Sequence, residues 1–245
     1  MLVSVILPTR GTKPVLLQRA LASVRAQTYE PVELIVVVDG GVAVDAGDDA
    51  QVLVLPSPTQ GRPGLARNAG LAVAKGELVA FLDDDDAWVP TKLDRQLLAM
   101  ARDATDMACA AAVDAPDLSL PEATPPTHPL LLPRIFGRDA IAARNRVVCS
   151  SVVLRTRLAR DVGGFSDAKY GQDWDLWLRC LAHTSCSYDQ QPLVYLNADP
   201  NDVDRSTVRA EVRHSISRVL DARGAGAEEE PRLAALVAGF SGAAA

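Results

Sequence analysis

The sequence predicts a single α/β domain with a mostly parallel central sheet and helices on both faces. Short apolar runs alternate with segments of helical periodicity, and the connections between them are short. A row of carboxylates directly follows one of the apolar runs, at the end of a strand where parallel sheets bind their ligands. The chain of 245 residues is long enough to bury a sizeable core.

The first hundred residues contain the clearest elements. The continuous apolar run at residues 2–7 predicts a buried parallel strand, and Pro14 is well placed to open the helix that follows. Further apolar runs predict three more strands, and one segment has the spacing of a helix. The strands are expected at residues 33–38, 51–55 and 78–82, and the helix at residues 64–74.

The second half of the chain is less regular. Residues 114–134 are rich in proline, which excludes regular structure, and loops of this length are usually functional or disordered. We expect a strand at residues 147–154 and an amphipathic helix at residues 173–182. Residues 224–245 are rich in alanine and glycine, so the expected domain covers residues 1–223 and a tail follows it.

Composition narrows the class of protein. The net charge of −6 gives no support for nucleic acid binding, which needs a basic face. The four cysteines lack CxxC spacing, which favours reduced core residues over a zinc site; they are Cys109, Cys149, Cys180 and Cys186. No apolar run is long enough to cross a bilayer, and the first residues lack a basic leader, so we expect a cytoplasmic protein. The oligomeric state stays open.

Four consecutive carboxylates, Asp83 to Asp86, follow the predicted strand at residues 78–82. Adjacent anions repel one another, and a divalent cation would relieve that repulsion. Mg²⁺ and Mn²⁺ prefer carboxylate oxygens and complete their shell with water and substrate phosphates. The pattern therefore predicts a site for Mn²⁺ or Mg²⁺, and a solvated acidic turn is the alternative.

Five segments, in this order, resemble the family 2-type glycosyltransferases, which have the GT-A fold. The opening strand ends in Pro-Thr, and a helix leads into a second strand that ends in Asp-Gly. An Ala-Arg-Asn helix, an Asp-rich segment with Trp and Pro, and a Gly-Gly-Phe…Gln-Asp-Trp motif complete the series. The segments lie at residues 3–9, 23–40, 64–70, 82–93 and 163–179. The resemblance spans about residues 2–196 and implies the GT-A fold and a nucleotide-sugar donor.

The resemblance assigns the donor site to residues 1–100. Asp39 is similar to the carboxylate that accepts the N3–H of a pyrimidine, which implies a UDP- or dTDP-sugar; a plain turn residue is the alternative. Arg67 resembles the nucleotide-side arginine, with a surface ion pair as the alternative. Asp85 is similar to the direct metal ligand, with Asp83 and Asp199 as further candidates. The remaining residues implied at the nucleotide sugar are Pro8, Thr9, Arg10, Asp83 and Asp84.

The acceptor site is assigned to residues 101–223. Asp173 resembles the base that removes the proton from an acceptor hydroxyl, and the single candidate base implies an inverting reaction. A helix N-terminus would keep this carboxylate ionised, and a plain N-cap role is the alternative. Gln172, Trp174 and Trp88 are implied on the acceptor side, and for both tryptophans core packing is as good an interpretation.

Two departures from the family pattern keep other functions open. Gln172 stands where the family has Glu, and residues 194–201, where the family often has a His, contain none. Asn197 or Asp199 would have to substitute as an oxygen ligand, and Arg205 would supply positive charge to the pyrophosphate. A nucleotidyltransferase of related fold is one alternative, although the segment after the first strand is a poor phosphate loop. A non-catalytic module that binds nucleotide sugars is the other. The sequence does not identify the sugar or the acceptor.

Overall fold

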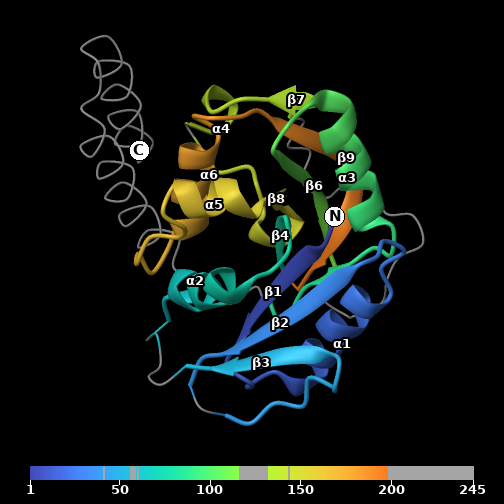
Figure 1. Ribbon diagram of the computed structural model, residues 1–245, viewed down its shortest axis with the longest axis vertical. Coiled ribbons are helices and arrows are strands. Elements are labelled where there is room, and N and C mark those ends of the chain that lie inside the picture. Colours follow the sequence, from blue (N-terminus) through green and yellow to red (C-terminus); the bar gives the residue numbers. More distant parts are fainter. Residues whose placement is uncertain (41, 56–58, 60, 116–131, 143, 198–245) are drawn as a thin grey trace, which may run out of the picture.

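The computed structural model describes residues 1–40, 42–55, 59, 61–115, 132–142 and 144–197. Its centre is a nine-stranded sheet in the order β3-β2-β1-β4-β8-β6-β9-β5, with β7 paired to β9 (Figure 1). The strands are β1 (Val3–Thr9), β2 (Val32–Val38), β3 (Ala50–Val54), β4 (Leu78–Phe81), β5 (Ala87–Trp88), β6 (Met107–Asp114), β7 (Ile135–Phe136), β8 (Val153–Arg155) and β9 (Cys186–Leu196). The helices are α1 (Pro14–Arg25), α2 (Pro63–Val73), α3 (Lys92–Asp103), α4 (Asp139–Ala142), α5 (Thr156–Asp161) and α6 (Gln172–Cys180), with a 3₁₀ turn η1 (Cys149–Ser151).

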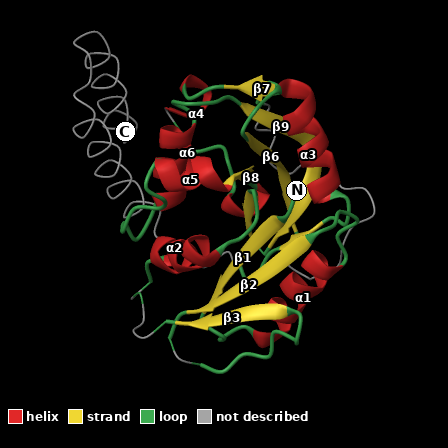
Figure 2. Cartoon of the chain, in the orientation of Figure 1, coloured by secondary structure: helices red, strands yellow, loops and turns green. Residues whose placement is uncertain are grey.

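The sheet has a parallel half and a mixed half. β1 pairs in parallel with β2 and β4, and β2 pairs in parallel with β3. β8 then runs antiparallel to β4 and β6, while β6 and β9 are parallel. The predicted α/β fold with a central sheet flanked by helices is confirmed (Figure 2).

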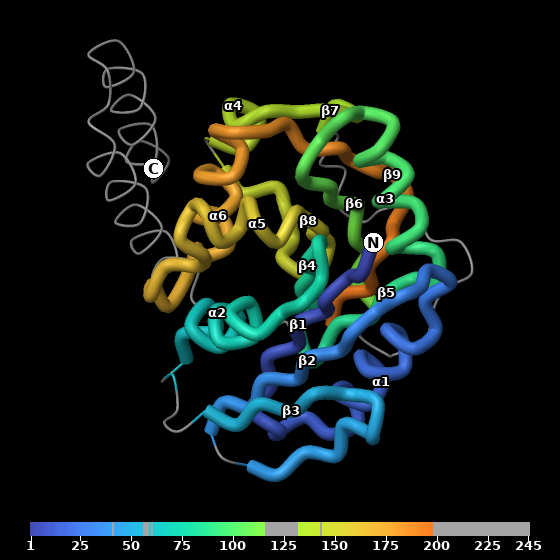
Figure 3. Tube along the Cα trace, in the orientation of Figure 1, coloured from blue at the N-terminus to red at the C-terminus, as the bar shows by residue number. Residues whose placement is uncertain are grey.

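Helices cover both faces of the sheet because side chains alternate along each strand. On β1, Ile6 belongs to the core cluster beneath α2 and α6, whereas Val5 and Leu7 belong to the cluster beneath α1 and α3. Both clusters consist of fully or nearly fully buried apolar side chains. Because both faces of these strands are covered, successive residues along a strand must all be apolar, and this explains the continuous apolar runs in the sequence. The chain path in Figure 3 shows that these helices come from distant parts of the sequence.

The strand expected at residues 147–154 is wrong for most of its length. Cys149–Ser151 forms the turn η1, and only Val153–Arg155 pairs in the sheet as β8. The hydroxyls of Ser150 and Ser151 make hydrogen bonds with Asp86 and with the main chain of Val148, respectively. An apolar run predicts burial in this segment correctly, but the buried backbone turns instead of extending.

The four cysteines are buried and free, as predicted. Three long elements, α3, β6 and β9, were not part of the prediction. β6 is rich in alanine, which is a weak strand former, so its strand character depends on its pairing with β8 and β9. Within the described ranges, no helix has the length and apolar character needed to cross a bilayer.

Candidate functional site

Three predicted site segments meet at the carboxyl edge of the parallel half of the sheet. Thr9 is the last residue of β1, Asp39 directly follows β2, and Asp83 lies two residues beyond β4. Because β1 pairs in parallel with both β2 and β4, these three ends lie at one edge. Open α/β sheets bind their ligands at this edge.

The ends of β1 and β2 are tied together at Thr9. The amide of Asp39 donates to the carbonyl oxygen of Thr9 at 2.7 Å. The Thr9 hydroxyl donates to Asp84 at 2.5 Å and accepts from the amide of Gly11 at 3.0 Å. Burial raises the pKa of Asp84, the hydrogen bond from Thr9 lowers it, and the neighbouring carboxylates of Asp85 and Asp83 raise it further.

Asp39 is buried, and its carboxylate is held by one residue. The amide of Thr59 donates to Oδ1 of Asp39 at 2.6 Å, and the Thr59 hydroxyl donates to Oδ2. Both carboxylate oxygens keep further lone pairs for a second donor. The structure thus gives Asp39 a fixed orientation, and its role at a pyrimidine stays a prediction.

Arg67 lies on α2 and is only 3% exposed, so the alternative of a surface arginine is wrong. Its Nη2 donates to Asp83, and its guanidinium lies 5.5 Å from the centre of the Phe165 ring. Burial lowers the pKa of Arg67, but the charge of Asp83, the hydrogen bond to Asp83 and the charges of Cys149 and Asp173 together raise it by more, so the guanidinium stays charged. Its Nε and Nη1 atoms are buried without a hydrogen-bond partner. A buried charge with two unused donors is suited to an anionic ligand.

Each of the other two carboxylates in the acidic row also has a partner. Asp85 accepts from Nζ of Lys13 at 2.8 Å, and its side chain is 22% exposed. Asp86 is buried and accepts from the Ser150 hydroxyl at 2.6 Å and from the amide of Asn197 at 3.2 Å. Burial, followed by the charge of Asp83, raises the pKa of Asp86 to about 8. Of the four, Asp85 therefore has the most replaceable partner, the exposed Lys13.

Asp173 lies in a cavity of about 500 Å³ together with Arg67 and Asp83. It is the second residue of α6, and the N-cap position is occupied by Gly171, so Asp173 is not the N-cap residue. Nδ2 of Asn145 donates to Oδ2 of Asp173 at 3.1 Å. The cavity thus brings the candidate base to the candidate donor site across about ninety residues of sequence.

The environment of Asp173 has opposing effects on its basicity. Burial raises the pKa of the carboxyl, while the backbone at Trp174, the charge of Arg67 and the bond from Asn145 lower it. The net effect is a raised pKa. A carboxylate with a raised pKa is a stronger proton acceptor, and its local hydrogen bonds favour the ionised form that must accept the proton.

The two tryptophans predicted on the acceptor side belong to the core. Trp88 is 1% exposed, and its Nε1 donates to the carbonyl oxygen of Ser150 at 2.8 Å. Trp174 is 5% exposed, and its Nε1 donates to the carbonyl oxygen of Ile141 at 2.8 Å. Neither ring has an open face for a sugar, so the packing interpretation holds for both. Gln172 is also buried, although it lines the cavity.

The remaining predicted residues are placed as follows. Pro8 is half-buried within β1, and Arg10 is exposed just beyond the end of that strand. Asp199 and Arg205 lie outside the described residues, so their suggested roles stay predictions. Asp175 pairs with Arg179 one turn further along α6, at 2.6 Å, which gives it a structural role.

Sequence reasoning missed Asn145 and Ser150. Asn145 orients Asp173, and the Ser150 hydroxyl accepts from the amide of Asp83 at 3.1 Å while donating to Asp86. Both residues lie in irregular segments, before and within η1. No local pattern identifies them, because their partners are 28 and more than 60 residues away.

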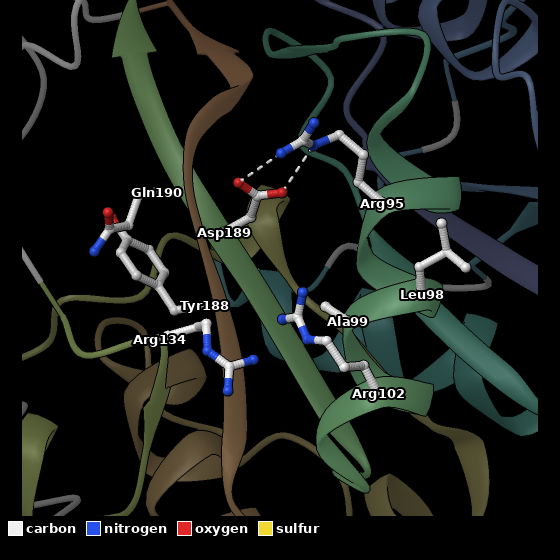
Figure 4. A pocket seen from close by; sticks show the side chains of 8 residues that line it. All are labelled: Arg95, Leu98, Ala99, Arg102, Arg134, Tyr188, Asp189 and Gln190. Carbon is white, nitrogen blue, oxygen red and sulfur yellow. Dashed lines mark hydrogen bonds and ion pairs between the residues drawn. The ribbon is translucent and has the colours of Figure 1, made fainter.

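A second pocket of about 500 Å³ lies between α3, β9 and the segment before β7, away from all the predicted site residues (Figure 4). Arg95 makes two hydrogen bonds to Asp189, at 2.8 and 3.1 Å. Arg102 and Arg134 both pair with Asp103. The arginines there are thus matched by carboxylates, and we assign no ligand to this pocket.

Comparison with known proteins agrees with this geometry. The family described as "Glycosyl transferase family 2" matches residues 4–157. An uncharacterised glycosyltransferase of Nostoc is 44% identical over 87 residues, which cover 32% of this chain and 27% of the relative. The succinoglycan biosynthesis protein ExoW of Rhizobium meliloti is 37% identical over 111 residues, covering 40% of this chain and 34% of ExoW. The matches therefore span about a third of these relatives or less.

Among solved structures, S. aureus TarS 1-349 in complex with UDP-GlcNAc has the same fold, with a TM-score of 0.69 at 21% identity. The alignment covers 98% of this chain and 71% of that structure. Because the family match covers more than half of the sequence and includes β1, β2, β4 and the acidic row, the chain belongs to glycosyl transferase family 2.

Proposed function

We propose that this chain transfers a glycosyl group from a nucleotide-sugar donor, a UDP- or dTDP-sugar, to a hydroxyl acceptor with inversion at the anomeric carbon. The observation that carries the proposal is the cavity shared by Asp173, Arg67 and Asp83. It joins a candidate base from the acceptor half to the carboxyl edge of the donor half. Family membership supports glycosyl transfer over the nucleotidyltransferase and non-catalytic alternatives.

The donor half supplies recognition of the nucleotide. Asp39, fixed by Thr59, would accept the N3–H of uracil or thymine, and Thr9 is held beside it through the main chain. The two unused donors of Arg67 would face an anionic part of the donor. The UDP-GlcNAc complex of TarS, a protein of the same fold, supports a donor of this class.

The acceptor half supplies the proton acceptor. The acceptor oxygen would attack the anomeric carbon as its proton passes to Asp173. The bond from that carbon to the diphosphate breaks, and the nucleoside diphosphate leaves with the electron pair. Asn145 holds the carboxylate of Asp173 in one orientation for this transfer.

The residues fit a divalent cation, Mn²⁺ or Mg²⁺, at Asp85. In the described ranges, no three His, Cys, Asp or Glu side chains converge as a complete metal site. Mg²⁺ needs only one or two carboxylates when phosphates and water complete its shell. Asp85 is half-buried and bound to the exposed Lys13, which a cation could displace. Asp83, which already pairs with Arg67, is a weaker candidate. When bound, the cation would stabilise the charge of the leaving diphosphate.

The test is an activity assay with UDP- and dTDP-sugars, a panel of hydroxyl acceptors, and Mn²⁺ or Mg²⁺. Release of nucleoside diphosphate with an inverted glycosidic bond, read by NMR of the product, is the expected result. Release of pyrophosphate from a nucleoside triphosphate would contradict it. Retention of the anomeric configuration would overturn the single-displacement mechanism.

A further inference from the structure

Two exposed cations line the cavity that contains Asp173. Arg146 precedes η1, and Lys169 lies in the connection between α5 and α6. Arg146 directly follows Asn145, the residue that binds Asp173, and Lys169 precedes Asp173 by four positions. The two cations therefore reach the cavity from two separate segments that meet at Asp173.

Neither cation is matched by a carboxylate of the described chain. The ion pairs formed between described residues include neither Arg146 nor Lys169. Nζ of Lys169 lies 5.2 Å from the centre of the Tyr170 ring, a contact that leaves its charge uncompensated. The second pocket provides a contrast, because its arginines are paired with Asp103 and Asp189.

The charges that line the Asp173 cavity favour an anionic ligand. Its cations are Arg67, Arg146 and Lys169, and its carboxylates are Asp83 and Asp173. Asp83 is already paired with Arg67, so it does not neutralise the charges of Arg146 and Lys169, the two exposed cations at the mouth of the cavity. This positive mouth is unusual on a chain with a net charge of −6.

We propose that Arg146 and Lys169 bind a phosphate group of the acceptor, so that the substrate class of this site is a phosphate ester carrying a free hydroxyl. The inference rests on the proposed function for the identity of the acceptor, but the anion site stands on its own geometry. A guanidinium can bind two phosphate oxygens, and an ammonium adds a point charge. Anchoring the phosphate at the mouth would position the hydroxyl near Asp173.

Binding of simple probes to the full chain tests this inference without knowledge of the natural acceptor. Glucose 1-phosphate, a glycerol phosphodiester and glucose are titrated calorimetrically into the chain, with and without saturating UDP and Mn²⁺. We expect both phosphate probes to bind at least ten-fold more tightly than glucose, also when UDP is saturating. A preference between the two probes distinguishes a phosphomonoester acceptor from a phosphodiester one.

The variants are Arg146→Gln, Lys169→Gln and the pair. Each single change should weaken phosphate-probe binding by about ten-fold, the loss expected for one charge-assisted hydrogen bond. UDP affinity should stay within two-fold of the unaltered chain. The control is Arg157→Gln, whose side chain is 91% exposed on α5 and pairs with Asp161; it should change neither affinity.

Three outcomes would overturn the inference. One is equal binding of glucose and glucose 1-phosphate, and another is unchanged phosphate binding in the double variant. The third is a loss of UDP affinity in the double variant with phosphate binding intact, which would assign both cations to the donor. Failure of the proposed function looks different: UDP would not bind at all, while the phosphate probes would still depend on Arg146 and Lys169.

Discussion

Nδ2 of Asn145 donates a 3.1 Å hydrogen bond to Oδ2 of Asp173, linking the segment before η1 to the first turn of α6. This bond and the nearby charge of Arg67 oppose the effect of burial on the Asp173 carboxyl. The pair therefore controls both the orientation and the proton affinity of the candidate base.

The first prediction concerns Asp173 itself. Asp173→Asn keeps the shape of the side chain but removes the base, so turnover should fall by about 10²–10⁴-fold. UDP affinity should change little, because the residue lies on the acceptor side. Steady-state kinetics and calorimetry on the same preparation measure both. Near-normal turnover would make Asp173 structural.

The second prediction concerns pH. Because the pKa of Asp173 is raised, the acid limb of the kcat/KM profile should lie above the value of about 4 that is usual for Asp. Activity should be lost as the pH falls through this limb, since the protonated acid cannot accept a proton. Asn145→Ala removes one of the groups that lower the pKa, so the limb should move to higher pH. A limb that does not move in this variant would contradict the proposed coupling.

The third prediction concerns the cation. Asp85→Asn should abolish the increase in UDP affinity that Mn²⁺ produces, while the melting temperature of the chain without metal stays nearly constant. Isothermal titration with and without Mn²⁺ measures the difference. Asp48→Asn, at an exposed acidic position away from the site, is the control and should keep the full effect of Mn²⁺. A normal Mn²⁺ effect in Asp85→Asn would remove this residue from the metal site.

The fourth prediction concerns the nucleobase. UDP and dTDP should bind more tightly than CDP, because cytosine has no N3–H to donate to Asp39, and leaving a buried acceptor position unsatisfied costs about 1–3 kcal/mol. Asp39→Asn should reduce this preference. Competition binding with the three diphosphates checks it, and equal affinities for all three in the unaltered chain would disprove the role of Asp39.

The fifth prediction concerns Lys92, which is fully buried. Its Nζ donates to Oε1 of Gln96 at 2.7 Å and lies 4.0 Å from the centre of the Trp88 ring. Burial holds the pKa of Lys92 well below its usual value. Between the lowered folded pKa and the unfolded value of about 10.4, the unfolded chain binds one more proton than the folded chain. The free energy of unfolding should therefore rise with pH in this window, by up to about 1.4 kcal/mol per unit.

Denaturant unfolding at a series of pH values measures this slope. Lys92→Met keeps most of the buried stem and removes the titration, so its slope should be smaller. Lys75→Met, at an exposed lysine after α2, should leave the slope unchanged. An identical slope in the chain and in Lys92→Met would show that the buried lysine does not titrate in this range.

Local pattern was sufficient for the donor half of the fold. The strands β1, β2 and β4 appear within two residues of the predicted positions, because each is a continuous apolar run with a clear stop. The same logic failed at residues 147–154, where an apolar segment turns through η1. The pattern of apolar residues predicts which segments are buried. It does not predict whether the backbone of a buried segment pairs with a neighbouring strand or makes hydrogen bonds with side chains.

The sequence alone determined the order of strands and helices from β1 to β4, the position of the acidic row after β4, and the match to a family, because these depend on short-range patterns. Only the tertiary structure decided what each residue contacts. It buried Trp88, paired Arg67 with Asp83, and brought Asn145 to Asp173. These contacts join segments whose spacing in sequence carries no periodic signal, so they exist only once the sheet has placed the segments at one edge.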